Sequence, residues 1–366
     1  MVGTNEHPDG VMGYRERRRM IWEIGKRSLK SKNIWIFCHE NPDGDTLGCG
    51  LAVYASLTNI GKEPHYFSPS PVPRMYSYLP YADMVDTTQE LPGEPPEIIL
   101  VHDNAAFDRL GDAYSAQLTK MGIGPLAKTK NPHCTLINVD HHASNEYYGD
   151  INLVDYTFGC CGELVFRAFQ QLGVRFNQAI VINLYATVLT DTGRFSYGNT
   201  SYQSFQIASE LILHGADPFD VVNRVYNTRS VEQVHLLSKV LSTITLERGL
   251  GYFYCYVTRE MLKQTSTLLS DTEGVLDIMK TVSDFDVCFF LKEVERNLIR
   301  VSARSNGNID VNQFAKRFGG GGHPAAAGFE MALTLDRAPA ALAAEMRTFR
   351  EELAPKPGAH LERSLK

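Results

Sequence analysis

Apolar and polar positions alternate along the first part of the chain in a way that predicts strands and helices in turn. Short apolar runs rich in β-branched and aromatic residues predict strands at 33–39, 63–68, 96–103 and 134–140. Apolar residues three and four positions apart predict helices at 15–30, 46–61, 162–173 and 177–189. This alternation predicts an α/β domain with a mostly parallel, doubly wound sheet and helices on both faces.

The pattern changes after residue 215. Residues 216–245 are more polar, with helical spacing, and predict a connector. Apolar runs at 251–258, 286–294 and 298–305 then predict strands of a smaller α/β domain, which a helix and a glycine-rich segment follow. We therefore expect domains at 14–215 and 246–353, a helical linker at 216–245, and an active site in the cleft between the two domains.

Composition narrows the class of protein. Of 366 residues, 43% are apolar and 21% charged, which excludes a disordered or collagen-like chain. Seven cysteines without a C-x-x-C pair are typical of reduced, buried thiols. The sequence shows neither an apolar leader nor a stretch long enough to cross a bilayer, so we expect a cytoplasmic protein without a membrane partner. A net charge of −6 argues against nonspecific binding of long nucleic acid.

Acidic and histidine residues follow three of the predicted strands and one helix. Each group alone is more often a solvated turn. The carboxyl ends of parallel strands converge on one crevice, however, and so many carboxylates and imidazoles there would require cations. Aspartate with neutral histidine suits Mn²⁺, Mg²⁺ or Zn²⁺. The residues are His39, Asp43, Asp45, Asp103, Asp140, His141, His142 and Asp191.

These motifs, in this order, resemble the DHH phosphoesterase superfamily. The first domain has H-x-x-x-D-x-D at 39–45, the isolated Asp103, D-H-H at 140–142 and Asp191. Downstream, RVSARS at 300–305 and GGGGHPAAAGF at 319–329 resemble the DHH-associated C-terminal domain. The arrangement is most similar to the NrnA-type oligoribonucleases, which degrade very short RNA and dephosphorylate 3′-phosphoadenosine 5′-phosphate.

The resemblance implies two Mn²⁺ ions in the active site, for which Mg²⁺ or Co²⁺ could substitute. Two cations sharing Asp103 would supply a hydroxide for in-line attack on phosphorus. One ion would be held by His39, Asp43 and Asp103, and the other by Asp45, Asp103, His141 and Asp191.

The resemblance also implies roles for residues beside the ions. Asp140 would orient an imidazole, and His142 would contact the substrate phosphate or assist the leaving oxygen, so the expected catalytic residues are His142, Asp103 and Asp140. In the second domain, the terminal phosphate would be bound by His323, Arg304, Ser302 and the backbone N–H groups of Gly321 and Gly322. The glycine run read by itself would be a flexible loop.

We therefore expect a Mn²⁺-dependent phosphodiesterase that hydrolyses short 5′-phosphorylated oligoribonucleotides, including the dinucleotide pApA, and 3′-phosphoadenosine 5′-phosphate. A cyclic-di-AMP phosphodiesterase remains an alternative. A RecJ-like exonuclease is disfavoured because no further nucleic-acid-binding domain fits in the chain. A non-enzymatic nucleotide sensor is disfavoured because every expected ligand is present. The expected partners are short RNA, dinucleotides and nucleoside bisphosphates rather than long duplexes. The sequence leaves open the exonuclease polarity, the preferred oligonucleotide length and base, and whether the chain forms a homodimer.

The chain departs from the family pattern in two places. Cys160 and Cys161 stand where relatives often carry small hydroxyl residues, as does Cys49. The segment at 121–134 is longer than usual. Neither change removes an expected metal ligand.

Overall fold

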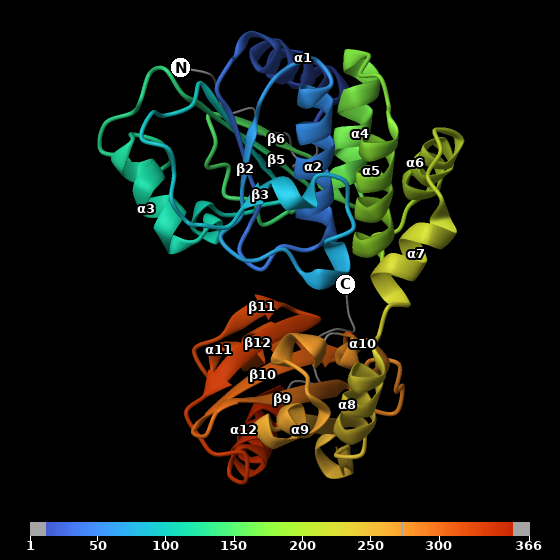
Figure 1. Ribbon diagram of the computed structural model, residues 1–366. Helices are drawn as coiled ribbons and strands as arrows, with labels where there is room; N and C mark the ends of the chain where they lie inside the picture. The colour runs from blue at the N-terminus through green and yellow to red at the C-terminus, as the bar shows by residue number, and fades with distance from the viewer. Residues whose placement is uncertain (1–11, 273, 354–366) are drawn as a thin grey trace, which may run out of the picture. The chain divides into compact units, whose positions relative to one another are not determined.

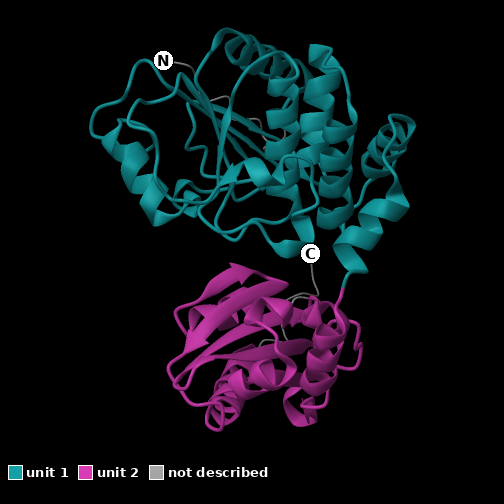
Figure 2. Cartoon of the chain, in the orientation of Figure 1, with its two compact units in different colours: residues 1–228 teal, residues 229–366 magenta. Residues whose placement is uncertain are grey.

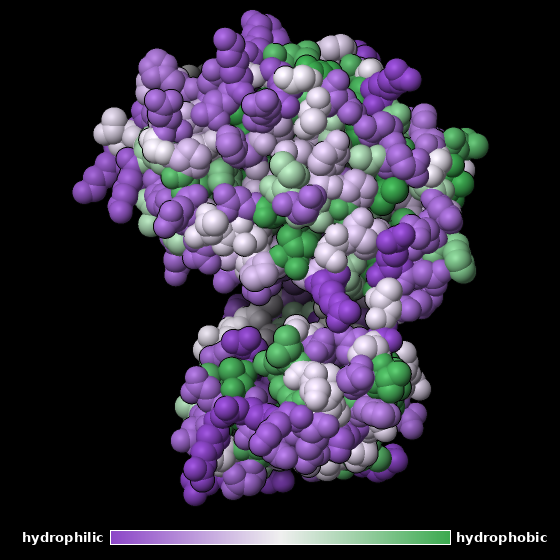
Figure 3. All heavy atoms as spheres, viewed as in Figure 1, coloured by the Kyte–Doolittle hydropathy of each residue, from purple (hydrophilic) through white to green (hydrophobic). Residues whose placement is uncertain are grey.

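In the computed structural model of the chain, residues 12–272 and 274–353 are described. The chain divides into two compact units, residues 1–228 and 229–366 (Figure 2). Each unit has its own sheet and its own hydrophobic cores. In Figure 3 the visible surface of both units is mostly hydrophilic, with scattered apolar side chains, which is ordinary for a globular protein.

Unit 1 is built on a six-stranded parallel sheet with the order β3-β2-β1-β4-β5-β6 (Figure 1). Alternate residues of the strand at 34–37 face different cores. Ile34 and Ile36 contribute to one core, and Trp35 and Phe37 contribute to the other. A strand buried on both faces reads as a continuous apolar run, which is why the sequence pattern located it. The doubly wound α/β prediction is confirmed. The strands are β1 (Ile34–Phe37), β2 (His65–Phe67), β3 (Val85–Asp86), β4 (Ile98–His102), β5 (Thr135–Asp140) and β6 (Ile151–Val154).

The helices of unit 1 cover both faces of this sheet. One core contains residues of α1, α2, α4, α5, α6 and α7, and the other contains residues of η3 and α3. The sequence pattern found α1, α2, α4 and α5 but not the short strands β3 and β6. The helices are α1 (Tyr14–Lys30), α2 (Gly44–Thr58), η1 (Arg74–Tyr76), η2 (Ala82–Met84), η3 (Phe107–Leu110), α3 (Asp112–Lys120), α4 (Cys161–Leu172), α5 (Gln178–Asp191), α6 (Tyr202–Leu213) and α7 (Pro218–Tyr226).

Unit 2 is a smaller α/β unit around a six-stranded mixed sheet with the order β11-β12-β10-β9-β8-β7. Helices α11 and α12 pack on one face, and α8 and α10 cover part of the other. Its elements are α8 (Val231–Leu241), β7 (Thr245–Glu247), η4 (Arg248–Leu250), β8 (Tyr252–Val257), α9 (Arg259–Thr265), η5 (Leu269–Thr272), α10 (Val275–Met279), β9 (Val287–Glu295), β10 (Leu298–Ser305), α11 (Val311–Lys316), β11 (Gly321–His323), β12 (Ala326–Met331) and α12 (Ala338–Leu353).

The segment expected to be a helical linker, 216–245, contains two helices. Val221 and Val225 of α7 are buried in the core of unit 1. Leu236 and Val240 of α8 are buried in a core of unit 2. No helix in the described part of the chain is long and apolar enough to cross a membrane. Residues 1–11, where an apolar leader was sought, lie outside the described residues.

Candidate metal centre

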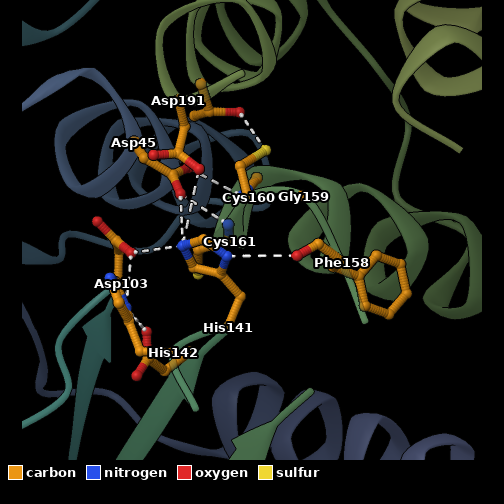
Figure 4. A network of polar contacts seen from close by, with 12 residues as sticks. Asp45, Asp103, His141, His142, Phe158, Gly159, Cys160, Cys161 and Asp191 are labelled. Carbon is orange, nitrogen blue, oxygen red and sulfur yellow. Dashed lines mark hydrogen bonds and ion pairs between the residues drawn. The ribbon is translucent and has the colours of Figure 1, made fainter. Parts of the chain in front are cut away.

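Three loops and one helix end bring the predicted ligands together at the carboxyl edge of the sheet in unit 1. Strands β1, β4 and β5 are neighbours and run in the same direction, so the residues that follow them meet. The last residue of α5, Asp191, completes the cluster from the helical layer (Figure 4). Every metal ligand expected from the sequence therefore lies in one place: His39, Asp43, Asp45, Asp103, His141 and Asp191.

Asp103 links the sets of possible ligand atoms. Within each of three groups the donor atoms lie within 4.8 Å of one another, and two of the groups contain Asp103. Its two carboxylate oxygens point in different directions, with Oδ2 3.6 Å from His39 Nε2 and Oδ1 3.4 Å from His141 Nε2. The groups are His39–Asp43–Asp103, Asp103–His141–His142 and Asp45–His141–Asp191.

The backbone of Asp103 is held in an uncommon conformation. Its φ of 55° lies in the left-handed region, which is unfavourable for a residue with a Cβ. A hydrogen bond from the Asp103 N–H to the Val139 carbonyl, at 2.9 Å, fixes this backbone against β5. Such strained residues are concentrated at functional sites, because the surrounding structure must maintain them.

The separations between ligand atoms are those that a shared cation would produce. His141 Nε2 lies 3.8 Å from both Asp45 Oδ2 and Asp191 Oδ2, which is too far for a hydrogen bond. Two ligands each about 2.1 Å from one ion in tetrahedral geometry would lie about 3.4 Å apart. Asp103 Oδ1 is buried and has no hydrogen-bond partner among the described residues. An unpartnered buried carboxylate oxygen is the donor that a cation would satisfy.

The tautomers of the two histidines also suit a cation. His39 Nδ1 lies 2.9 Å from the Glu40 carbonyl, and His141 Nδ1 lies 3.3 Å from the Phe158 carbonyl. A carbonyl oxygen only accepts hydrogen bonds, so both Nδ1 atoms carry the proton. Both Nε2 atoms then present a lone pair to the carboxylates, and this arrangement is typical of histidines that bind metal.

Asp45 is held by the first turn of α4. The Cys161 N–H donates to Asp45 Oδ2 at 2.6 Å, and the Gly162 N–H donates to Oδ1 at 3.0 Å. The Cys49 thiol donates to Oδ1 at 3.4 Å. The N-terminus of a helix favours a negative charge, so these contacts orient the Asp45 carboxylate toward the centre. Cys49 and Cys161 thus contact Asp45, a role that the sequence did not indicate.

Asp191 and the Phe158–Gly159 turn share one support. Asn199 Nδ2 donates to Asp191 Oδ2 at 3.1 Å and to the Gly159 carbonyl at 2.8 Å. The Gly159 N–H in turn donates to Glu163 Oε2 at 3.1 Å. Sequence reasoning missed the role of Asn199, because an asparagine eight positions after Asp191 carries no recognisable spacing signal.

His142 and Asp140 form a separate pair beside the cluster. His142 Nδ1 donates to Asp140 Oδ1 at 2.8 Å, and Asn145 Nδ2 donates to Asp140 Oδ2 at 2.6 Å. Asp140 is fully buried, whereas 27% of the His142 side chain is exposed. His142 Nδ1 also lies 3.5 Å from Asp103 Oδ1. The imidazole therefore has a fixed orientation and an accessible edge.

Without a cation the cluster would be electrostatically unfavourable. Burial, together with the charge of Asp103, raises the pKa of Asp45 well above its ordinary value. Burial raises the pKa of Asp191 to about 7, and the charge of Asp103 also contributes. Burial lowers the pKa of His141, but Asp103, Asp45 and Asp191 together raise it far more. Divalent ions would remove this mutual repulsion.

The predicted substrate residues of unit 2 lie in two rows of its sheet that share a face, with the row of Gly322 between them. Arg304 on β10 pairs with Ala326, which pairs with His323 on β11. Two residues further along β10, Ser302 pairs with Gly328, which pairs with Gly321. Because directly opposite residues share a face, the four side-chain positions of the prediction lie on one face with only small residues between them.

The glycine run is not a free loop in this unit. Gly321, Gly322 and His323 form the edge strand β11, and Gly322 has a φ of 148° that favours glycine. An added Cβ at Gly322 would lie 2.4 Å from the Ala326 carbonyl oxygen. An edge strand leaves part of its N–H groups unpaired, so donors remain available here.

Comparison with known families finds two matches along the chain. Residues 33–190 match the DHH family, N-terminal domain, and residues 251–351 match the DHHA1 domain. The first span contains every ligand expected from the sequence except Asp191, which lies one residue beyond it. The second contains the rows of Ser302 and Arg304.

Curated relatives are similar over most of the chain. One, named bifunctional oligoribonuclease and PAP phosphatase NrnA from Thermus thermophilus, is 28% identical over 327 residues, covering 89% of this chain and 92% of the relative. A protein of the same name from Bacillus subtilis is 26% identical, covering 79% and 86%. Among solved structures, an exopolyphosphatase-related protein from Bacteroides fragilis has a TM-score of 0.80 at 24% identity, covering 92% of this chain and 98% of that one, which supports the fold.

Proposed function

We infer that this chain, which belongs to the DHH family of metal-dependent phosphoesterases and carries a DHHA1 domain, hydrolyses short RNA. Its proposed substrates are short 5′-phosphorylated oligoribonucleotides and 3′-phosphoadenosine 5′-phosphate. We further propose that two Mn²⁺ ions serve the reaction. The relatives named oligoribonuclease and PAP phosphatase support this choice of substrates.

One observation carries the proposal: Asp103 lies between two ligand sets and has an unpartnered carboxylate oxygen. A monodentate aspartate of a single site would not need its two oxygens directed at different histidines. His39, Asp43 and Asp103 would hold one ion. Asp45, Asp103, His141 and Asp191 would hold the other. The donor set, which consists of carboxylate oxygens and imidazole nitrogens without a thiolate, favours Mn²⁺ over a structural zinc.

Two such ions supply Lewis-acid stabilisation of phosphate oxygens and a hydroxide at neutral pH. The remaining chemistry falls to the chain's own residues. His142, fixed by Asp140, would present Nε2 to a phosphate oxygen or the leaving oxygen. Unit 2 would bind the substrate's terminal phosphate through Arg304, Ser302 and His323, because an arginine can grip phosphate with two parallel hydrogen bonds.

A substrate panel tests this function. Turnover of pApA, 3′-phosphoadenosine 5′-phosphate, cyclic-di-AMP and a long RNA would be measured by chromatography with added Mn²⁺ and after chelation. We expect pApA and the bisphosphate to be hydrolysed fastest, and activity to disappear on chelation. Preference for the long RNA or for cyclic-di-AMP would contradict the proposed substrates, and turnover after chelation would contradict the metal requirement.

A pair of arginine variants tests the role of unit 2. Arg304→Ala should raise KM for pApA by about tenfold or more, because a bidentate phosphate contact is lost. Arg296→Ala, at an exposed position of the β9–β10 hairpin, removes the same charge and should leave KM unchanged. Equal effects of both substitutions would mean that unit 2 contributes only general charge.

A further inference from the structure

A large cavity lies beneath α1 in unit 1, on the opposite face of the sheet from α3. Its volume is about 1900 Å³, and its walls come from α1, α2, α4 and strands β4 to β6. Of the 17 residues of α1, only Ile21 and Gly25 are buried. The helix therefore covers this space without filling it.

The cavity is apolar inside and extends across the sheet. Val53, Leu100, Leu153 and Phe169 are among the residues that line it. One end lies at His102, the last residue of β4 and thus at the carboxyl edge of the sheet. The other end reaches Lys30, Ile60 and Arg175, which belong to the segments just before β1, after α2 and after α4, at the amino edge. The lining therefore extends from one edge of the sheet to the other.

Positive charge is concentrated where the cavity opens. Lys26, Lys30 and Arg175 line it and are exposed, and no hydrogen bond or ion pair holds any of the three within the described residues. The acidic residues nearby have partners: Glu23 pairs with Arg27, and Asp150 with Lys130. In Figure 3, hydrophilic and apolar side chains lie side by side at the top of unit 1, where Figure 1 places α1.

The inner end of the cavity holds an unsatisfied polar group. His102 is 2% exposed, and its Nδ1 has no hydrogen-bond partner in the described part of the chain. A buried nitrogen without a partner is unfavourable unless a ligand or water satisfies it.

We propose that this cavity binds an elongated aliphatic carboxylate whose chain ends in a hydroxyl or carbonyl group. The carboxylate lies at the mouth beside Lys26, Lys30 and Arg175. The chain fills the apolar interior, and the terminal polar group bonds to His102. A ligand site of this kind is an apolar cavity with few polar groups that set its orientation. The site is independent of the proposed hydrolysis.

The probes separate the contributions of charge, chain and terminal group. Binding to the full chain would be followed by displacement of the fluorescent fatty acid cis-parinaric acid. The competitors are hexadecanoate, its ω-hydroxy derivative, the uncharged hexadecanol and the short anion butyrate. We expect the ω-hydroxy acid to bind most tightly and hexadecanoate to follow. Hexadecanol should bind about tenfold more weakly than hexadecanoate, and butyrate should not compete.

Three variants and two controls test where the ligand binds. Ala168→Trp puts a large ring into the cavity and should abolish binding, whereas Ala116→Trp, exposed on α3 across the sheet, should not. The double change Lys30→Glu and Arg175→Glu should weaken hexadecanoate about tenfold without affecting hexadecanol. Arg296→Glu in unit 2 is the control for altered charge. His102→Phe should no longer prefer the ω-hydroxy acid, but it should still bind hexadecanoate.

The proposal is overturned if no probe binds saturably, or if Ala168→Trp and Ala116→Trp bind equally well. Equal affinity for hexadecanol and hexadecanoate would overturn the proposed carboxylate contact with Lys26, Lys30 and Arg175. If His102→Phe still preferred the ω-hydroxy acid, the proposed contact with His102 would be overturned. Thermal unfolding of each variant shows whether it is folded. Because His102 precedes Asp103, the Ala168→Trp result decides if His102→Phe does not fold.

Discussion

Asp43 and Asp45 come from the same short turn and belong to different ligand sets, and their surroundings differ. Only 1% of the Asp45 side chain is exposed, against 55% of Asp43. We call Asp45, His141 and Asp191 the inner side of the centre and His39 and Asp43 the outer side. Asp45 receives two backbone N–H groups and a thiol, whereas Asp43 uses Oδ1 to cap α2, accepting from the Asp45 and Thr46 N–H groups.

If the centre holds two ions as proposed, this difference should make it hold them unequally. The inner ligands are fixed before any ion arrives, so little ordering remains to be done on binding. The outer side has an exposed carboxylate that water competes for and that is tied to the helix by its other oxygen. The inner side should therefore bind a divalent ion more tightly than the outer side.

The largest effect should come from the residue that the two sides share. Asp103→Asn removes a charge from both ligand sets and should lower kcat at least about a thousandfold, with loss of both ions. Asp112→Asn, exposed at the start of α3, is the matched control. Metal content by mass spectrometry and turnover of pApA would be measured together. Retention of both ions would show that Asp103 does not bridge them.

Substitutions on the two sides should differ in size. Asp45→Asn should weaken the tighter Mn²⁺ site about 100-fold, because it also leaves the N–H groups of α4 without their anion. Asp43→Asn should weaken only the second site, by about tenfold. Isothermal titration with Mn²⁺ would resolve the two steps. If both variants lose the same step, the division into inner and outer sides is wrong.

Removing the hydrogen bond that positions Asp191 should weaken only the inner side of the centre. Asn199→Ala deletes the bond to Asp191 and should weaken the inner site about tenfold, a size typical of residues that orient metal ligands. Asn199→Asp keeps the size of the side chain but loses the N–H donor and adds a negative charge beside Asp191, so it should not restore affinity. Asn297→Ala, exposed in the β9–β10 hairpin, is the control. An equal loss at the outer site would indicate a general disturbance of the fold.

The smallest expected effect is on stability. Burial raises the pKa of Glu163 above its ordinary value of 4.5, so the folded protein binds this proton more strongly than the unfolded chain. Stability that Glu163 confers is complete below pH 4.5 and declines as pH rises through its folded pKa. Glu163→Gln keeps an acceptor for Gly159 and removes the titration.

The Tm of Glu163→Gln relative to wild type should therefore rise with pH, measured by calorimetry of the metal-free protein from pH 4 to 8. Glu351→Gln, exposed near the end of α12, should show no such trend. A Tm difference that is constant across this range would mean that Glu163 ionises as readily in the folded protein as in the unfolded one.

Sequence reasoning predicted the longer strands, and the gathering of the expected ligands at one edge, for one physical reason. Strands buried on both faces are continuous apolar runs, and the polar residues directly after β1, β4 and β5 must lie at one edge of a parallel sheet. The short edge strands β3 and β6 carry no such run. The supports of the ligands were invisible for a different reason: the Phe158 carbonyl and the Cys161 N–H are backbone groups that any residue would supply.

Unit 2 shows the same limit. The glycine run suggested exposed donors, and its place in the edge strand β11 depends on pairing with β12, which no local pattern indicated. The juxtaposition of Arg304 with His323 across Ala326 likewise follows from register, which is a property of the folded sheet.

The central claim is that Asp103 lies between two divalent ions. Electron paramagnetic resonance of the protein loaded with Mn²⁺ tests it directly, because two ions that share a carboxylate are magnetically coupled. We expect a coupled signal from two ions per chain, and the signal of a single ion when only one equivalent of Mn²⁺ is added. Two uncoupled ions, or saturation at one ion per chain, would contradict it.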